Sequence, residues 1–588
     1  MKLSDYVIDC LKQQGVSHVF EFIGGAIVHL LDSVSFRDDM ECVSVRHEQA
    51  GAFAAEAYAR MNGKLGVAMA TSGPGALNLL TGIGSCFFDS VPCLFITGQV
   101  NTYEYKFDRP VRQIGFQETD IVSVAEPLTK YAVMVTDPAQ IRFELEKAVY
   151  LAQNGRPGPV LLDIPMNIQR AQIEPGNLVS FFDSEEYKDL SEDSEITDST
   201  IVDVINMLGE AKRPLILAGG GVRASNSTEQ LAQFIEKTGM PIVSSLMGLD
   251  VISHEHPLYS GLIGSYGNRY SNLILANCDL LVILGSRLDS RQTGTRPDTF
   301  GRAAKKIHVD IDYNELNSKV EATLAVKANL NDFLTRINSE LTGFNKPDIT
   351  DWLKSIKRLK NLYPTYSFYP EENEIEPNRF MELLSSKSGH FGAICLDVGQ
   401  HQMWASQSFK LSQSQRLLNS GGMGAMGFAV PAAIGATLAT GDEALVIAGD
   451  GGFQLNIQEL DTIVRLNLPV KIVVMNNSSL GMVRQFQDLY FEGRQQSTVN
   501  PNPSFIDIVS AYTIPAFQMN SMIDLQQLEN FLNTEGPAFI EVILEKKTEV
   551  HPKLVVNRPI EDMYPYLDRE ELKKIMLIDL VDEMDIPT

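Results

Sequence analysis

Two apolar runs near residue 450 are each followed by residues that can bind a metal ion. The run 444–448 leads into a glycine-rich turn that contains Asp450, and the run 470–475 leads into Asn477. A helix-length segment separates the two runs, so the stretch is predicted to form a βαβ unit. Because parallel strands end at the same edge of a sheet, Asp450 and Asn477 are expected to face one small volume.

The sheet edge where Asp450 and Asn477 are predicted to meet, here called the metal corner, suits a divalent cation that carries a phosphorylated ligand. A carboxylate, an amide oxygen and a backbone carbonyl are hard oxygen donors, which Mg²⁺ prefers, with phosphate oxygens or water at its other positions. Glycines on both sides of Asp450 would let the backbone approach a diphosphate group. A Rossmann-like unit without a metal is the alternative interpretation of the same pattern.

The rest of the chain supplies elements that can hold such a corner. Residues 1–175 alternate helical patterns with short apolar runs at 42–45, 67–70, 93–97 and 160–164, which predicts a parallel sheet covered by helices. The segments 67–98 and 445–477 share one order of strand, glycine turn, helix, proline and strand, which predicts two related α/β domains. Stretches near 176–200 and 363–377 are predicted to be linkers.

Composition limits the classes of function. A chain of 588 residues is long enough for three or four domains, and a formal charge of −25 argues against nucleic acid or an anionic membrane as a partner. Six cysteines without paired spacing are interpreted as buried thiols of a reducing compartment. Because no signal-peptide pattern and no long apolar stretch occur, the protein is expected to be cytoplasmic.

Ordered motifs along residues 1–550 resemble the catalytic subunit of acetohydroxyacid synthase, also called acetolactate synthase, which uses thiamine diphosphate (ThDP). They include RHEQAGAFAAEAYAR at 46–60, GSRLDSRQTG at 285–294, NSGGMGAMG at 419–427, GDG at 449–451 and NN at 476–477. The resemblance implies an α/β fold of three doubly wound parallel-sheet domains. These would be a pyrimidine-binding domain at 1–175, a central FAD- or nucleotide-binding-like domain at 195–345, a diphosphate-binding domain at 365–550, and a C-terminal tail at 551–588 that covers its own domain or a neighbouring subunit.

The resemblance also implies roles at the ThDP site. Glu48 would be buried and would hydrogen-bond the cofactor's aminopyrimidine, whereas an exposed partner of the helix dipole is the alternative. The metal ligands would be Asp450, Asn477 and the main-chain carbonyl of Ser479. The catalytic set would also include Gly25, Phe116 and Gln117. The other cofactor-binding residues would be Gln400, His401, Gly424, Met426, Gly449, Gly451, Gly452 and Met482. Without the resemblance, His401 is more simply a structural histidine and Met426 a filler of the core.

In the resembling family the central domain holds FAD, which need not take part in redox chemistry. The residues that match that site are Arg156, Gly219, Gly220, Gly221, Gly264, Gly285, Arg287, Asp289 and Asp310. FAD is therefore expected here, while some relatives bind ADP or nothing at this position.

The implied reaction decarboxylates pyruvate and transfers the remaining two-carbon unit to a second 2-oxo acid. Arg291 would bind the carboxylate of the acceptor, unless it forms a salt bridge elsewhere. Val483 and Phe486 complete the predicted substrate site. A homodimer or homotetramer is expected, because ThDP lies between two chains in this superfamily, and a regulatory subunit is left open.

Four departures from the family leave the acceptor open. Met166, Ser290 and Phe486 stand where the family has lysine, aspartate and tryptophan, and the loop 101–115, with Arg109 and Arg112, is longer. The alternative hypothesis is a carboligase that uses another ketone, such as a nucleotide-linked keto sugar in polysaccharide synthesis. A non-catalytic binding or regulatory relative is a third hypothesis, disfavoured because Glu48, Asp450 and Asn477 are all present.

Overall fold

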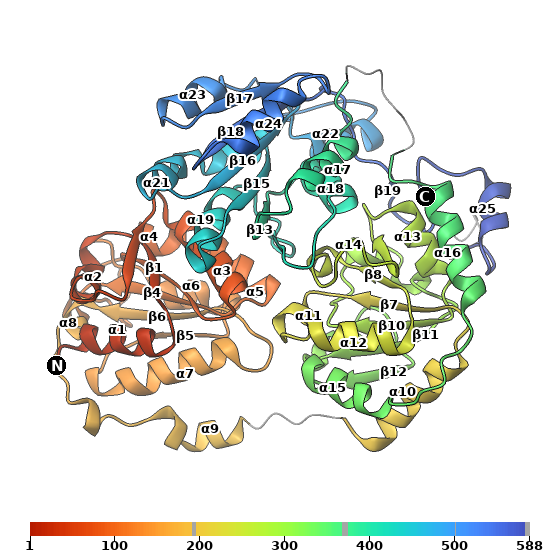
Figure 1. The fold of residues 1–588 in the computed structure, drawn as a ribbon. Helices are drawn as coiled ribbons and strands as arrows, with labels where there is room; N and C mark the ends of the chain where they lie inside the picture. Colours follow the sequence, from red (N-terminus) through yellow and green to blue (C-terminus); the bar gives the residue numbers. More distant parts are fainter. Residues whose placement is uncertain (191–195, 367–373, 500, 582–588) are drawn as a thin grey trace.

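The computed structural model describes residues 1–190, 196–366, 374–499 and 501–581, which contain three six-stranded parallel sheets (Figure 1). Helices cover the faces of each sheet, as in doubly wound α/β domains. The predicted boundary at residue 195, part of the predicted linker 363–377 and the end of the predicted tail lie outside the described residues.

The first sheet contains every strand predicted for the N-terminal part of the chain, together with β1 and β5. Its central strands are buried along their whole length, which explains their almost continuous apolar sequences. Across the sheet the strands are β2 (Glu41–Ser44), β1 (His18–Phe22), β3 (Gly66–Ala70), β4 (Cys93–Gln99), β6 (Val160–Pro165) and β5 (Tyr131–Met134). The main helices are α1 (Leu3–Gln13), α2 (Val28–Ser35), α3 (Glu48–Asn62), α5 (Leu80–Asp89) and α7 (Ile141–Gln153).

The third sheet repeats the strand order of the first. Numbered within each sheet, both run 2-1-3-4-6-5, so these two parts of the chain share their topology as well as the order of elements seen in the sequence. Across the sheet the strands are β14 (Arg416–Leu418), β13 (Ala393–Leu396), β15 (Ala444–Gly449), β16 (Val470–Asn476), β18 (Ala538–Ile543) and β17 (Ala516–Met519). The main helices are α17 (Pro377–Lys387), α18 (Gln400–Ser408), α19 (Ala429–Thr440), α20 (Asp450–Leu455), α21 (Leu460–Arg465), α22 (Gly481–Tyr490), α23 (Phe505–Ala511) and α24 (Leu525–Asn533).

The central sheet has a different order, 3-2-1-4-5-6, which is the order of dinucleotide-binding folds. Its strands, in that order, are β9 (Tyr259–Leu262), β8 (Ile242–Ser244), β7 (Pro214–Ala218), β10 (Leu280–Leu284), β11 (Lys305–Asp310) and β12 (Leu324–Lys327). The main helices are α10 (Asp198–Glu210), α12 (Thr228–Thr238), α13 (Arg269–Asn277), α15 (Leu330–Glu340) and α16 (Thr350–Leu362).

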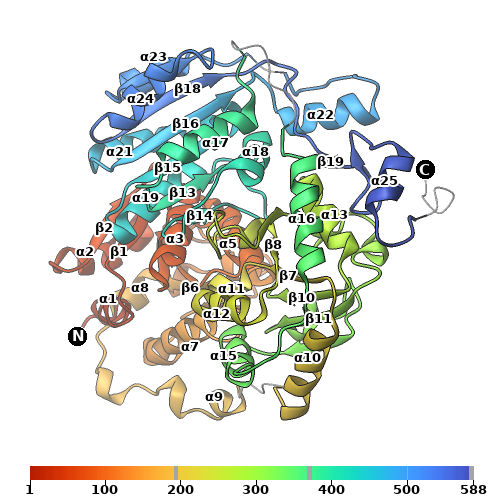
Figure 2. The ribbon, with the colours of Figure 1, turned by 45° about the vertical axis from the view of Figure 1, so that its right-hand side comes forward.

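The first and third domains are joined by α3 and α19, which lie side by side (Figure 2). Small residues face each other there: an ideal Cβ on Gly435 would lie 2.0 Å from the carbonyl oxygen of Ala54. Side chains of both helices belong to one apolar core. The alanine-rich sequence of α3 therefore allows two domains to pack with their backbones almost in contact.

The C-terminal tail packs on the central domain, beside α16 (Figure 1). Leu572 of α25 (Arg569–Ile575) joins the apolar cluster that contains Trp352, and Arg302 forms an ion pair with buried Glu561 at 2.8 Å. The expectation that the tail covers its own domain holds only in part: the backbone N–H of Val556 donates to the Tyr490 hydroxyl of α22, but the apolar contacts of α25 lie on the central domain. A contact of the tail with a neighbouring subunit stays a prediction. Sequence periodicity could not predict where the apolar side chains of the tail pack, and the structure shows that they pack on the central domain.

Two other expectations can be compared with the structure. Cys86, Cys93, Cys278 and Cys395 are buried as predicted, whereas Cys10 is half-buried and Cys42, on an edge strand, is exposed. Among the described residues, no helix has both the length and the apolar character needed to cross a membrane.

Candidate active site and a second pocket

The predicted metal corner forms where the neighbouring parallel strands β15 and β16 end. Asp450 directly follows the first strand, and Asn477 follows the second. The backbone N–H of Ser479 donates to Asp450 Oδ2 and to Asn477 Oδ1, in both cases at 3.1 Å. The structure thus brings together the two side chains whose convergence was predicted from the βαβ pattern.

The corner is rich in neutral oxygens around one carboxylate. Asn502 Nδ2 donates to Asp450 Oδ2 at 2.7 Å and to Asn476 Oδ1 at 3.1 Å. Burial raises the pKa of Asp450, and the hydrogen bonds from Asn502 and from backbone N–H groups oppose that rise. No cluster of three or more His, Cys, Asp or Glu side chains able to hold a metal occurs in the described residues. The donors present suit Mg²⁺ shared with a phosphorylated ligand.

The corner opens into a pocket of about 200 Å³. At Gly424 an ideal Cβ would meet no atom within 4 Å, so the backbone there faces open space. At Gly452 the opposite holds, because a Cβ would lie 2.2 Å from Asp397 Oδ1. The predicted residues that line this pocket are Arg291, Gln400, His401, Gly424, Met426, Gly449, Asp450, Gly451, Gly452, Asn477, Ser479, Met482 and Val483.

His401 carries an unused polar atom within this pocket. Its Nε2 is buried and has no hydrogen-bond partner among the described residues. Burial lowers the pKa of His401 to about 3, so the ring is neutral near pH 7. A buried polar atom beside glycine backbone is what a polar ligand would satisfy. The residues present therefore fit the diphosphate and metal end of ThDP.

Glu48 is buried, with 7% of its surface exposed, which excludes the alternative of a solvent-exposed helix-dipole partner. It is the first residue of α3, and its Oε2 accepts a hydrogen bond from Asn78 Nδ2 at 2.9 Å. It is not among the residues that line the pocket, and neither is any other described residue of the first domain. Within one chain, Glu48 and the metal corner do not line the same pocket.

The other predicted catalytic residues also lie on the first domain, outside this pocket. Phe116 is 85% exposed, and Gln117 has a φ of 64°, an unusual value for a residue with a side chain. Gly25 faces open space, because an ideal Cβ would meet no atom within 4 Å. Phe486 is half-exposed on α22, where it packs on Tyr490 with ring centroids 4.5 Å apart, and it does not line the pocket.

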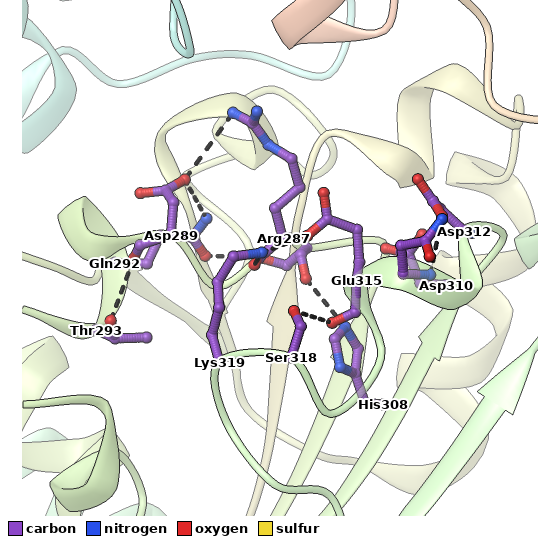
Figure 3. Close-up of polar contacts among 12 residues, drawn as sticks. Arg287, Asp289, Gln292, Thr293, His308, Asp310, Asp312, Glu315, Ser318 and Lys319 are labelled. Carbon is purple, nitrogen blue, oxygen red and sulfur yellow. Dashed lines mark hydrogen bonds and ion pairs between the residues drawn. The ribbon is translucent and has the colours of Figure 1, made fainter.

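A second pocket, of about 490 Å³, is lined by residues of the first and central domains. Arg156 Nη1 lies 2.9 Å from both Asp312 and Glu315. Figure 3 shows the central-domain wall, where Arg287 extends toward Asp289 at 3.9 Å and Lys319 contacts Glu315. The charged lining residues are Lys130, Arg156, Arg287, Asp289, Asp312, Glu315 and Lys319, and Phe87 and Phe88 are the aromatic ones. Cations beside aromatic rings suit a ligand with phosphate and ring groups.

The glycines predicted for the FAD site do not line this second pocket. An ideal Cβ on Gly219 would lie 2.1 Å from the Gly285 carbonyl oxygen, and one on Gly221 would lie 2.7 Å from Gly285 Cα. Gly264 has a φ of 110°, and Gly220 packs on Met247. Close packing on neighbouring backbone, or on Met247 for Gly220, therefore explains why these positions carry glycine, without a bound ligand. Asp310 is buried at the end of β11, and burial raises its pKa to about 6.

Several contacts at the candidate active site were not predicted. Asn502 lies in a segment without a motif, so no signal in the sequence connected it to Asp450. Asn78 lies in the segment 67–98, whose pattern predicted a strand and a helix but no contact with Glu48. Asp397 did carry a signal in the sequence, because it directly follows the apolar run of β13 in the stretch that contains Gln400. Its two carboxylate oxygens accept the backbone N–H groups of Gly427 and Ala429, both at 3.0 Å.

Three family models match successive parts of the chain. They describe the N-terminal TPP binding domain (residues 1–124), the central domain (201–337) and the C-terminal TPP binding domain (397–542) of thiamine pyrophosphate enzymes. Each match lies within one of the three domains, although the first ends before β5 and the last begins after β13.

Relatives from bacteria and plants match over almost the whole chain. The acetolactate synthase large subunit of Lactococcus lactis subsp. lactis (strain IL1403) is 35% identical, over 95% of this chain and 95% of the relative. The acetolactate synthase isozyme 2 large subunit of Escherichia coli (strain K12) is 35% identical, over 94% and 97%. The chloroplastic acetolactate synthase of Arabidopsis thaliana is 36% identical, over 96% and 84%. With this similarity, three matching domains and a metal corner that fits a diphosphate, the chain belongs to the acetolactate synthase family of thiamine pyrophosphate enzymes.

Proposed function

We propose that this protein decarboxylates pyruvate and transfers the two-carbon unit to a second 2-oxo acid, using ThDP and Mg²⁺. The observation that carries the proposal is the convergence of Asp450 and Asn477 on the Ser479 N–H, in a glycine-walled pocket. When bound, ThDP supplies an electron sink for the charge left by decarboxylation. The protein's task is to hold that group, to orient it and to bind the two acids.

The third domain would hold the metal and the diphosphate. Asp450 Oδ2, Asn477 Oδ1 and the Ser479 carbonyl are the proposed metal ligands, and all three residues line the pocket. Gly449, Gly451, Gly452, Gln400 and His401 would contact the diphosphate, since backbone and neutral side-chain donors there can approach it closely. Gly424 and Met426 would contact the remainder of the cofactor.

The proposed site is shared between two copies of the chain. Glu48 would hydrogen-bond the cofactor's aminopyrimidine from one subunit, while the other subunit holds the metal, because within one chain Glu48 does not line the pocket of the metal corner. Both regions expose large apolar side chains: Ile23 (61%), Leu77 (42%) and Phe116 (85%) on the first domain, and Leu455 (53%) and Val483 (52%) on the third. Apolar side chains of this kind are commonly buried in homodimer interfaces. The smallest active species would be a homodimer.

The acceptor in this proposal is a 2-oxo acid, and Arg291 would bind its carboxylate. Arg291 lines the pocket, and no carboxylate of the described residues forms an ion pair with it. Its guanidinium lies 6.0 Å from the ring centroid of Tyr266, which leaves the fork of donors available for a planar carboxylate. The keto-sugar alternative is not favoured, because the relatives reported above are all named acetolactate synthases.

The second pocket is the proposed site of FAD, on the basis of its cations and its two phenylalanines. The Lactococcus and Escherichia relatives are named large subunits, so the proposal includes a smaller partner subunit.

Product analysis tests the proposed reaction. The purified protein is incubated with ThDP, Mg²⁺, FAD and pyruvate, and acetolactate is measured against released CO₂. We expect acetolactate as the main product. Slow release of CO₂ or acetaldehyde with little acetolactate would overturn the 2-oxo acid acceptor while leaving the decarboxylation step in place. Absence of both would overturn the function as a whole.

A further inference from the structure

All three domains meet at the segment 419–425, which leads into the candidate ThDP pocket. Arg60 of α3 donates to the carbonyl oxygen of Asn419 at 2.7 Å. The hydroxyl of Ser85 on α5 lies 3.1 Å from that of Ser420, which also accepts the backbone N–H of Ala425 at 3.2 Å. The first domain therefore holds this third-domain segment from its beginning.

Asp89 makes the next two contacts. Its Oδ2 accepts the backbone N–H of Gly421, and its Oδ1 accepts that of Gly422, both at 2.8 Å. Asp89 is the last residue of α5, where a negative charge is unfavourable for the helix dipole. Burial raises the pKa of Asp89, whereas the charges of Arg60 on its own domain and of Arg287 on the central domain lower it, as do the two backbone N–H groups of the third domain.

The two glycines between these domains leave no room for a side chain. An ideal Cβ on Gly421 would lie 2.3 Å from Met247 Sδ of the central domain, and one on Gly422 would lie 2.7 Å from Phe88 Cβ of the first. The backbone therefore packs closely on the central domain at Gly421 and on the first domain at Gly422, which is itself exposed, while Asp89 binds the N–H groups of both residues.

The other end of the same stretch is held by a second carboxylate, Asp397, through Gly427 and Ala429. Gly424 and Met426, which line the pocket, lie between the two anchored ends. The position of both residues in the pocket then depends on Asp89 at one end and on Asp397 at the other.

We propose that Asp89 is a positioning residue for ThDP: by binding the N–H groups of Gly421 and Gly422 across the domain boundary, it sets Gly424 and Met426 against the part of the cofactor beyond the diphosphate. This inference rests on the proposed function. It assigns to a first-domain residue, outside the pocket, control over one half of the cofactor site and none over the metal corner.

Calorimetric titration with two probes tests this division. ThDP with Mg²⁺ reports on the whole site, whereas inorganic pyrophosphate with Mg²⁺ reports on the metal corner alone. Loss of two hydrogen bonds to a charged acceptor in Asp89→Ala should raise the Kd for ThDP about tenfold or more. The Kd of Asp89→Ala for pyrophosphate should stay within about twofold of that of the unmodified protein, because the metal corner is built from β15 and β16. Asp89→Asn keeps one accepting oxygen, so its Kd for ThDP should lie between that of the unmodified protein and that of Asp89→Ala.

Asp137→Ala is the matched control, since Asp137 also accepts a backbone N–H, from Ala139 at 2.9 Å, but on an exposed turn. Equal weakening of both probes by Asp89→Ala, or of neither, would overturn the positioning role. If the alanine variant does not fold, the asparagine variant decides by the same comparison. If the unmodified protein binds neither probe, the proposed function fails, and the positioning role fails with it.

Discussion

Gln400 fixes the orientation of the Asn477 amide, because Gln400 Oε1 accepts a hydrogen bond from Asn477 Nδ2 at 2.8 Å. The Asn477 oxygen is thereby turned toward Asp450 and the Ser479 N–H. Gln400 is itself held by the Thr548 carbonyl, to which its Nε2 donates at 3.0 Å. A proposed metal ligand is thus oriented by a side chain from a different strand-to-helix turn.

Gln400→Ala should weaken Mg²⁺ binding, because the Asn477 amide would be free to turn its nitrogen toward the metal corner. We expect the Mg²⁺ concentration for half-maximal ThDP binding to rise about three- to tenfold. Gln407→Ala is the control, since Gln407 lies on the same helix and bonds the Tyr266 carbonyl instead. An unchanged Mg²⁺ requirement in Gln400→Ala would contradict the orienting role.

Chelation of divalent metal should abolish ThDP binding, and added Mg²⁺ should restore it. Asp450→Ala removes the carboxylate of the corner, so it should raise the required Mg²⁺ concentration by about 100-fold or more. Titration calorimetry over a range of Mg²⁺ concentrations measures the change. Asp442→Ala, in an exposed turn at the opposite end of β15, should leave the requirement unchanged. A normal requirement in Asp450→Ala would place the metal elsewhere.

Glu48→Gln should abolish turnover while leaving metal-dependent ThDP binding largely intact. The substitution keeps the size of the side chain and its contact with Asn78, but it removes the carboxylate that would bond the aminopyrimidine. Steady-state acetolactate formation and calorimetric ThDP binding are measured on the same preparation. Glu126→Gln, an exposed change on the same domain, serves as the control. Full activity in Glu48→Gln would contradict the proposed role.

Two inactive variants should complement each other if the site is shared between chains. In a mixed dimer of Glu48→Gln and Asp450→Ala, one site carries both substitutions and the other carries none. Random reassociation of equal amounts should therefore restore about a quarter of the unmodified activity. The measurement is activity after co-expression, with dimers verified by sedimentation. No recovery in verified mixed dimers would show that each chain provides a whole site.

Asp163 should make the protein less stable as the pH rises. It is buried at β6, accepts hydrogen bonds from Thr97 and Gln99 at 2.7 and 2.9 Å, and burial raises its pKa from 3.8 to about 7. Between pH 3.8 and about 7 the folded protein keeps this proton, whereas the unfolded protein releases it. The stabilisation is therefore complete below pH 3.8 and is lost as the pH rises through about 7.

Asp163→Asn tests this prediction, since the amide cannot ionise and the Thr97 hydroxyl can turn to accept its N–H. The free energy of unfolding of both proteins is measured by chemical denaturation at several pH values. From pH 4 to pH 8 the difference between the two free energies should change by about 2–4 kcal/mol in favour of the variant. A difference independent of pH would mean that Asp163 is ionised in the folded protein throughout this range.

Local patterns in the sequence determined much of the architecture. Apolar runs followed by glycine turns predicted β15 and β16, and parallel pairing then required Asp450 and Asn477 to share one edge. The same reasoning predicted β3, β4 and β6, because strands buried on both faces carry continuous apolar sequence. It also predicted β2, although this strand lies at the edge of the sheet and is partly exposed. β1 and β5 were missed. Glu21 interrupts the apolar run of β1, whereas β5 is a short apolar run at the edge of the sheet that was not assigned to a strand.

Only the tertiary structure decided which distant segments complete the site. Asp89 and Gly421 are 332 positions apart, and Asp450 and Asn502 are 52 apart, so neither contact leaves a periodic signal in the sequence. Which residues line the pocket of the metal corner, and that Glu48 is not one of them, likewise became known only from the folded chain. Sequence patterns determine elements and the sheet edges where they end, whereas contacts between domains depend on the shapes of surfaces formed only after those elements have packed.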